Sequence, residues 1–233
     1  MQSPGKHEFR HYFCSGCGHE IVAPVSCGNR FCPVCSVGPR LRARDRLLEL
    51  TQKAREVCPD PLRMLTLTIR DVDDPAVGFR LLVDAFRRLR TRQLWRNRVR
   101  GGVYVVEATG HAGSWHVHLH AIIQGQFLPQ RWISAQWKRL TSAPIVWINT
   151  VGSSRGAVMY LTQYLTKADV AADDLPVLSA ALRGSRMFSP FGSWHCLLQK
   201  AVRKSFLCPC CGRSDWVHDR VFDKARPWDG FSP

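Results

Sequence analysis

Three histidines stand at alternating positions in the segment WHVHLHAII, residues 115–123. Side chains two residues apart on a β-strand point to the same face, so His116, His118 and His120 would share one face. Imidazoles in this arrangement can bind one metal ion, and Glu107 is expected opposite them on a paired strand. His118, His120 and Glu107 leave open positions for a phosphate oxygen and water, which is typical of a catalytic metal. His116 could be a further ligand, a partner that orients a ligand, or a DNA contact.

The segment YLTQYLTK, residues 160–167, offers a nucleophile. Tyr160, Tyr164 and Lys167 would lie on one stripe of a helix. A phenol can form a covalent phosphate ester, but its ordinary pKa of about 10 requires a nearby cation to favour the phenolate. Lys167 or the metal ion could supply that charge. Paired tyrosines on a helix are more often packing residues, and the histidine strand is what favours the nucleophile interpretation.

Ten cysteines, several of them in CxxC pairs, favour zinc over disulfides in a cytoplasmic chain. Cys14, Cys17, Cys32 and Cys35 are predicted to close a zinc site of four thiolates, with Cys27 as an alternative ligand. Cys208 and Cys211 form half of a possible second zinc site. Several residues could complete that second site: His195, Cys196 or His218 as added ligands, or Cys210 in place of one thiol.

Alternation of apolar and polar residues predicts the strands that must position these groups, and apolar spacings of three and four predict the helices. A hairpin joins the Glu107 strand to the histidine strand through a turn that contains glycine. The pattern indicates an α+β fold with a central antiparallel sheet and packed helices. The expected strands cover residues 63–71, 101–110, 115–124 and 143–151, and the expected helices cover 38–57, 74–99, 129–142 and 156–169.

The charge balance points to an acidic partner. The formal net charge is +15 and the isoelectric point is about 9.9, which favours nucleic acid over simple solubility through surface charge. Trp115 or Trp132 could stack on unpaired bases. An apolar run of about 18 residues is not found, so no membrane span is expected. The N-terminal segment lacks the apolar core of a secretory signal, and we expect a cytoplasmic protein.

These motifs together resemble the HUH endonuclease superfamily, in particular rolling-circle replication initiators and the related two-tyrosine transposases. MLTLTIRD (residues 64–71) resembles the first strand motif, and HLH (118–120) resembles the His-hydrophobic-His motif. YLTQYLTK resembles the Tyr-x-x-x-Tyr-x-x-Lys helix, and SCGNRFCPVC (26–35) resembles the N-terminal cysteine module. The motifs occur in the family's order. We expect three segments: a four-cysteine zinc module (1–37), an HUH endonuclease core (38–170) and a basic C-terminal region with a possible second zinc knuckle (171–233).

The resemblance implies Mg²⁺ or Mn²⁺ at the two histidines and a third polar residue, with Zn²⁺ as a structural ion. It implies single-stranded DNA, often with a hairpin near the nick, as the substrate. Tyr160 and Tyr164 would be nucleophiles with Lys167 as their helper, giving a 5′-phosphotyrosine that initiates rolling-circle replication of a plasmid, phage or similar element. The sequence contains no GxxxxGK[ST] motif, so a host helicase and polymerase are expected partners.

Three alternatives to replication initiation stay open. A two-tyrosine transposase would use the same chemistry on other DNA ends. A non-enzymatic zinc-ribbon DNA-binding protein would use the histidines as a third structural zinc site and the tyrosines as packing residues. A metal-dependent hydrolase would use water, so it would not need either tyrosine.

Overall fold

The computed structural model describes residues 8–32, 35–165, 170–197 and 206–223, and the chain forms two compact units. One unit combines both ends of the chain, residues 1–35 and 200–233, and the other contains residues 36–199. This division differs from the three consecutive segments predicted from the sequence, because the C-terminal strand pairs with the N-terminal one. Within the described residues, no helix is long and apolar enough to cross a membrane.

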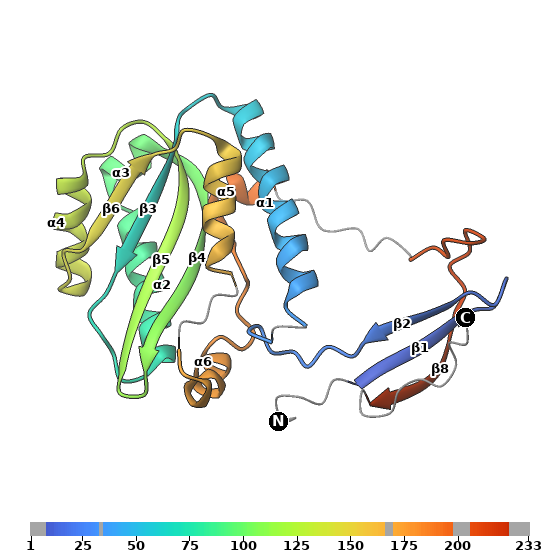
Figure 1. The fold of residues 1–233 in the computed structure, drawn as a ribbon. Coiled ribbons are helices and arrows are strands. Elements are labelled where there is room, and N and C mark those ends of the chain that lie inside the picture. Colours follow the sequence, from blue (N-terminus) through green and yellow to red (C-terminus); the bar gives the residue numbers. More distant parts are fainter. Residues whose placement is uncertain (1–7, 33–34, 166–169, 198–205, 224–233) are drawn as a thin grey trace. The chain divides into compact units, whose positions relative to one another are not determined.

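The larger unit is built on a five-stranded antiparallel sheet, which confirms the predicted α+β class. Its strand order is β6-β3-β5-β4-β7, so the histidine strand β5 lies at the centre (Figure 1). The predicted hairpin is present, since β4 and β5 pair along their whole length. The strands are β3 (Leu62–Thr68), β4 (Val99–His111), β5 (Ser114–Gly125), β6 (Val146–Thr150) and β7 (Ser189–Gly192).

Helices cover both faces of this sheet. Helices α1 (Val37–Val57) and α5 (Ser154–Gln163) pack together on one face, as Figure 1 shows. Their buried side chains form one apolar cluster with Val103, Val105 and Ile122 of the sheet. Helices α2 (Pro75–Arg90) and α4 (Gln130–Thr141) pack against each other and against β5 and β6, respectively. The shorter helices are α3 (Gln93–Arg98), α6 (Leu175–Ala181), α7 (Trp194–Leu197) and the 3₁₀ turn Ala172–Asp174.

The helix expected over residues 74–99 is divided into α2 and α3. Its start is as predicted, because the Asp74 side chain accepts a hydrogen bond of 2.7 Å from the Ala76 N–H and Pro75 occupies the first helical position. Its end comes early. The Thr91 hydroxyl donates to the Arg88 carbonyl at 2.8 Å, and Arg92 adopts an extended conformation. Such local side-chain bonds compete with continuation of a helix.

The smaller unit contains a three-stranded antiparallel sheet in the order β2-β1-β8. Its strands are β1 (Glu8–Cys14), β2 (Glu20–Pro24) and β8 (Trp216–Asp223). The buried His11 on the central strand links both neighbours, with Nε2 3.3 Å from Glu20 Oε2 and Nδ1 2.9 Å from Asp219 Oδ2. Strands from the N-terminal and C-terminal parts of the sequence therefore belong to one sheet.

Candidate active site and cysteine clusters

Strand register places the predicted ligands side by side on the central strand and its neighbours. On β3, Thr66 lies opposite His120 and Thr68 lies opposite His118. On β4, Glu107 lies opposite His118. Residues opposite each other on neighbouring strands point to the same face. The sheet therefore presents two imidazoles, one carboxylate and two hydroxyls together.

Both threonine hydroxyls contact the same ring atom of their histidine. Thr66 Oγ1 is hydrogen-bonded to His120 Nδ1 at 3.1 Å, and Thr68 Oγ1 is hydrogen-bonded to His118 Nδ1 at 3.0 Å. A histidine that binds a metal through one nitrogen usually holds its ring through a hydrogen bond at the other. The two threonines therefore occupy Nδ1 of each histidine, so a metal ion would bind through Nε2. The alternating pattern predicts this strand but does not reveal the role of its threonines.

Glu107 is buried, with 5% of its surface exposed, and its Oε2 lies 3.0 Å from His120 Nε2. His120 is similarly buried, and His118 is half-buried. Burial lowers the pKa of His118, and the Glu107 carboxylate opposes this shift in part. A lowered pKa favours the neutral imidazole, which is the form that binds metals.

The donor types of this group fit a divalent cation, but its atoms are arranged as a hydrogen-bonded pair with a second imidazole beside it. The His118 and His120 ring centroids lie 6.2 Å apart. In the described part of the chain, two groups place three or more possible ligand atoms within 4.8 Å of one another. Both groups consist of cysteines. Metal binding would have to replace the His120–Glu107 hydrogen bond with bonds from each residue to the ion.

The two tyrosines lie directly against this group. The Tyr164 ring stacks on the His120 ring, with centroids 3.7 Å apart and planes 8° apart. Tyr160 contacts Tyr164 edge to face at 5.2 Å and is 42% exposed. Burial raises the pKa of Tyr164, and its hydrogen bond with Tyr160 raises the pKa further. The site therefore holds one accessible phenol and one half-buried phenol beside the imidazoles.

Helix α5 is shorter than the helix predicted over residues 156–169. It ends at Gln163, and Tyr164 is its C-cap. The Tyr164 N–H donates to the Leu161 carbonyl at 3.2 Å, which tightens the last turn into 3₁₀ geometry. Lys167, the predicted helper of the tyrosines, lies outside the described residues.

His116 makes a different contact from the other two histidines. Its Nδ1 pairs with the Asp71 carboxylate, and both side chains are about half exposed. The pair lies two positions along β5 from His118, toward the hairpin turn. Trp115, considered above for base stacking, is fully buried, whereas Trp132 is half-buried.

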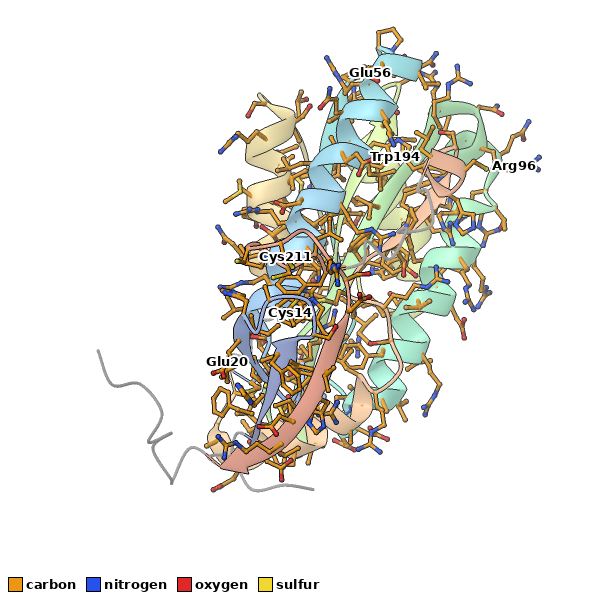
Figure 2. All side chains as sticks on the ribbon, turned by 90° about the vertical axis from the view of Figure 1, so that its right-hand side faces the viewer. Cys14, Glu20, Glu56, Arg96, Trp194 and Cys211 are labelled. Carbon is orange, nitrogen blue, oxygen red and sulfur yellow. The ribbon has the colours of Figure 1, made fainter. Side chains whose placement is uncertain are left out.

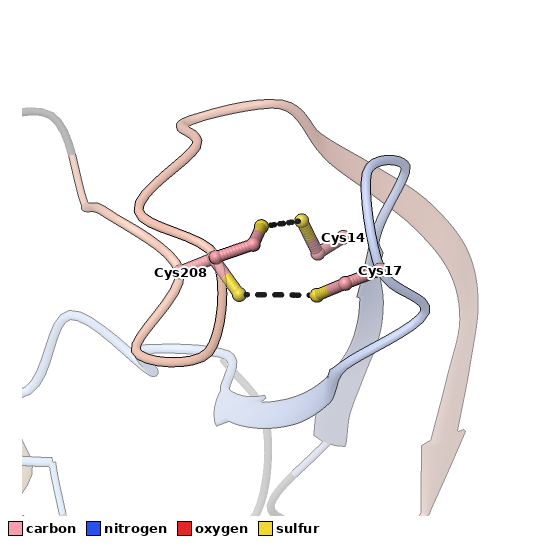
Figure 3. Close-up of side chains that lie close together, drawn as sticks. Cys14, Cys17 and Cys208 are labelled. Atoms are coloured by element: carbon pink, nitrogen blue, oxygen red, sulfur yellow. Dashed lines mark hydrogen bonds between the residues drawn. The ribbon is translucent and has the colours of Figure 1, made fainter.

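The cysteines group differently from the predicted zinc-binding set. Cys14 and Cys17 meet Cys208 and Cys211, because β8 pairs with β1 and brings the C-terminal CxxC turn to the N-terminal one. The Cys14 and Cys211 sulfurs lie 3.5 Å apart and the Cys17 and Cys208 sulfurs 3.6 Å apart (Figure 3; Cys14 and Cys211 are also labelled in Figure 2). In a tetrahedral zinc site with Zn–S bonds of about 2.3 Å, neighbouring sulfurs lie about 3.8 Å apart.

The ionisation of these thiols also suits a metal. Burial opposes ionisation of Cys208, but hydrogen bonds from the backbone N–H groups of Cys211 and Cys210, together with those from the Cys17 and Cys14 thiols, lower its pKa to about 6. A thiolate is therefore present in the cluster near neutral pH, and the thiolate is the form that binds zinc. Among the described residues, this four-cysteine group does not include the residues considered as added ligands of the second zinc site, His195, Cys196 and His218.

The cysteines predicted as partners of Cys14 and Cys17 form a separate group. Cys27, Cys32 and Cys35 place three sulfurs within 4.8 Å of one another. The Cys35 N–H donates to Cys32 Sγ at 3.3 Å, which is typical of a metal-binding turn. The five cysteines between residues 14 and 35 thus divide between two groups.

We predict that Cys208→Ser lowers the zinc content by one ion per chain and destabilises the β2-β1-β8 unit, because a structural zinc site contributes directly to folding. Native mass spectrometry and thermal unfolding would measure both effects. Cys196→Ser is the matched control, since Cys196 is an exposed thiol of the other unit. An unchanged zinc count in Cys208→Ser would contradict the grouping.

A second prediction concerns Thr66 and Thr68. The double change Thr66→Val, Thr68→Val keeps the β-branched shape of both side chains but removes the hydroxyls that hold His120 and His118. We expect Mn²⁺ affinity to fall about 10- to 100-fold, as for the loss of other groups that orient a ligand. Titration followed by Mn²⁺ electron paramagnetic resonance measures this without relying on activity. Thr150→Val, at the exposed end of β6, should leave the affinity unchanged.

An antiparallel sheet with two histidines on its central strand and two tyrosines on an adjoining helix is the arrangement that the HUH resemblance implies. The family model for replication proteins matches residues 19–189, which is most of the chain. The chain therefore belongs to this replication protein family, which supports a role as a rolling-circle replication initiator. No curated protein and no solved structure gave a match. Cys27, Cys32 and Cys35 lie inside the matched region, whereas the cluster of Cys14, Cys17, Cys208 and Cys211 lies outside it.

Proposed function

We propose that this replication protein nicks and rejoins single-stranded DNA by tyrosine transesterification, and thereby initiates rolling-circle replication. The observation that carries the proposal is the stacking of Tyr164 on His120 at 3.7 Å, with the exposed Tyr160 beside it. A structural zinc-ribbon protein has no need for a phenol that is accessible to solvent beside a buried His–Glu pair. The net charge of +15 suits the phosphate backbone of the substrate.

In the proposed reaction, the phenol oxygen of one tyrosine attacks the scissile phosphorus. A Tyr–O–P bond forms as the bond from phosphorus to the 3′-oxygen breaks. The phenol gives up its proton, and the departing oxygen takes up a proton to become a 3′-hydroxyl. The product is a 5′-phosphotyrosine, which preserves an ester bond, so a later 3′-hydroxyl can attack it and restore the DNA without ATP. The strand is thus opened and closed by two equivalent exchanges.

His118, His120 and Glu107 are the proposed ligands of Mg²⁺ or Mn²⁺, with Thr66 and Thr68 orienting the two rings. When bound, such an ion draws electron density from a phosphate oxygen and stabilises charge in the transition state. Tyr160 is exposed and can reach DNA directly. Burial favours the protonated form of Tyr164, so ionisation of this phenol requires a nearby positive charge. Lys167 is a proposed second source of that charge.

The proposal is tested with a pool of single-stranded oligonucleotides of random sequence labelled at the 3′ end, incubated with the protein and Mn²⁺. A 5′-phosphotyrosine transfers the labelled fragment to the protein, which then carries the label on a denaturing gel. A labelled band that requires Mn²⁺ is expected. Cleavage without labelled protein would indicate a hydrolase that uses water, and the absence of both would indicate a binding protein.

A further inference from the structure

An exposed tryptophan shares the sheet face of the candidate active site. Trp147 on the edge strand β6 lies opposite Thr66 of β3, and Thr66 in turn lies opposite His120 of β5. Residues in one such row point to the same face of the sheet. Two strand spacings of about 4.8 Å separate the backbones at Trp147 and His120, or about 10 Å along the row.

Trp147 is exceptional among the tryptophans of this unit. Trp95, Trp115, Trp137 and Trp194 are buried and Trp132 is half-buried, whereas 62% of Trp147 is exposed. Its indole N–H donates to the Asn149 side-chain oxygen when that amide is oriented to satisfy both of its groups. This hydrogen bond holds the polar edge of the indole against its own strand. Trp147 therefore contributes little to the core, yet its position is defined.

The chain just before β6 adds an apolar surface, and the segment after β3 adds a cation. Ile145, two residues earlier, is 63% exposed, and its carbonyl accepts a hydrogen bond of 3.3 Å from the Thr68 N–H. Arg70 is exposed, and its Nε donates at 3.2 Å to the carbonyl of Ser142, in the segment that leads into β6. A flat aromatic surface on β6 and a guanidinium two residues beyond the end of β3 match a single strand of DNA, because a base can stack and a phosphate can pair with the cation.

We propose that Trp147 is a stacking platform for an unpaired base of single-stranded DNA, next to the nucleotide at the histidines, with Arg70 as a phosphate partner. The inference rests on the proposed function and extends it to a subsite for the neighbouring nucleotide. Continuity of the row from His120 through Thr66 to Trp147 favours DNA over a protein strand added at the edge of β6. The net charge of +15 favours the same partner.

Binding is tested in the Tyr160→Phe, Tyr164→Phe background, so that no DNA is cleaved. Fluorescence anisotropy compares a short oligodeoxythymidine with an abasic strand of equal length and charge. Trp147→Ala is expected to weaken binding of the thymine strand about 10- to 100-fold, which is the range for loss of one base–aromatic stack. The affinity for the abasic strand should not change. Trp147→Phe should retain most of the affinity, because phenylalanine preserves an aromatic face.

Phe127→Ala is the matched control, because Phe127 is 63% exposed and lies beyond the far end of β5. Equal binding of the thymine strand by Trp147→Ala and its parent would overturn the inference, and so would an equal loss for both strands. The result is separable from the proposed chemistry. Weakened thymine binding without any labelled adduct in the active protein would support the stacking site and reject transesterification. Adduct formation with normal binding by Trp147→Ala would reject the stacking site alone.

Discussion

Nicking of single-stranded DNA is expected to fall at least about a thousandfold in the double variant Tyr160→Phe, Tyr164→Phe, because removal of a nucleophile leaves mainly the rate provided by binding and charge stabilisation. Phenylalanine keeps both rings, including the stack of residue 164 on His120, and removes the attacking oxygens alone. The measurement is the single-turnover rate of strand cleavage in Mn²⁺, followed with labelled DNA.

Single variants and a control make this result specific. Tyr160→Phe and Tyr164→Phe separately report which phenol starts the reaction, and we expect the exposed Tyr160 to be the more sensitive position in the first cleavage. Tyr104→Phe makes the same chemical change in the aromatic cluster of Phe86 and Phe191 and should leave the rate intact. Cleavage at the normal rate by the double variant would mean that water is the nucleophile.

The second large effect is expected from His118→Ala, His120→Ala. Loss of both imidazoles should lower Mn²⁺-dependent nicking at least about a hundredfold, since even the loss of a group that orients a metal ligand costs about 10- to 100-fold. Mn²⁺ affinity should fall in parallel. Calorimetric titration of Mn²⁺ and the cleavage rate across a Mn²⁺ series measure the two quantities separately.

His111→Ala is the control for this change, because His111 is an exposed histidine at the end of β4. The zinc count of the double histidine variant tests the structural alternative. The histidines would belong to a structural zinc site if the double variant lost a zinc ion and the parent protein also failed to nick DNA. An unchanged Mn²⁺ affinity would contradict their role as ligands.

The centre of the fold could be predicted because its signals are local. Alternation in LTLT and HVHLH identifies strands with one buried face, and a short glycine-containing turn fixes the hairpin register that sets Glu107 opposite His118. The sequence also predicts the capped start of α2. The strand Ser189–Gly192 was not predicted, because four residues containing proline and glycine show no alternation.

The remaining differences depend on contacts between distant residues. The sequence of a CxxC pair does not indicate which other cysteines it meets. Cys14 and Cys17 could therefore not be assigned to Cys208 and Cys211 without the pairing of β1 and β8. Trp147 looks like any core tryptophan until β6 is placed at the sheet edge. The threonines acquire a role only when the register sets them against His118 and His120.

The most direct test of the central claim is the chemical location of the protein–DNA bond. After reaction with single-stranded DNA in Mn²⁺ and digestion of the DNA by nuclease, trypsin should release residues 156–167, GAVMYLTQYLTK, carrying a 5′-linked nucleotide. Tandem mass spectrometry is predicted to place the phosphate on Tyr160 or Tyr164. Nicked DNA with free 5′-phosphates and an unmodified 156–167 peptide would contradict the account.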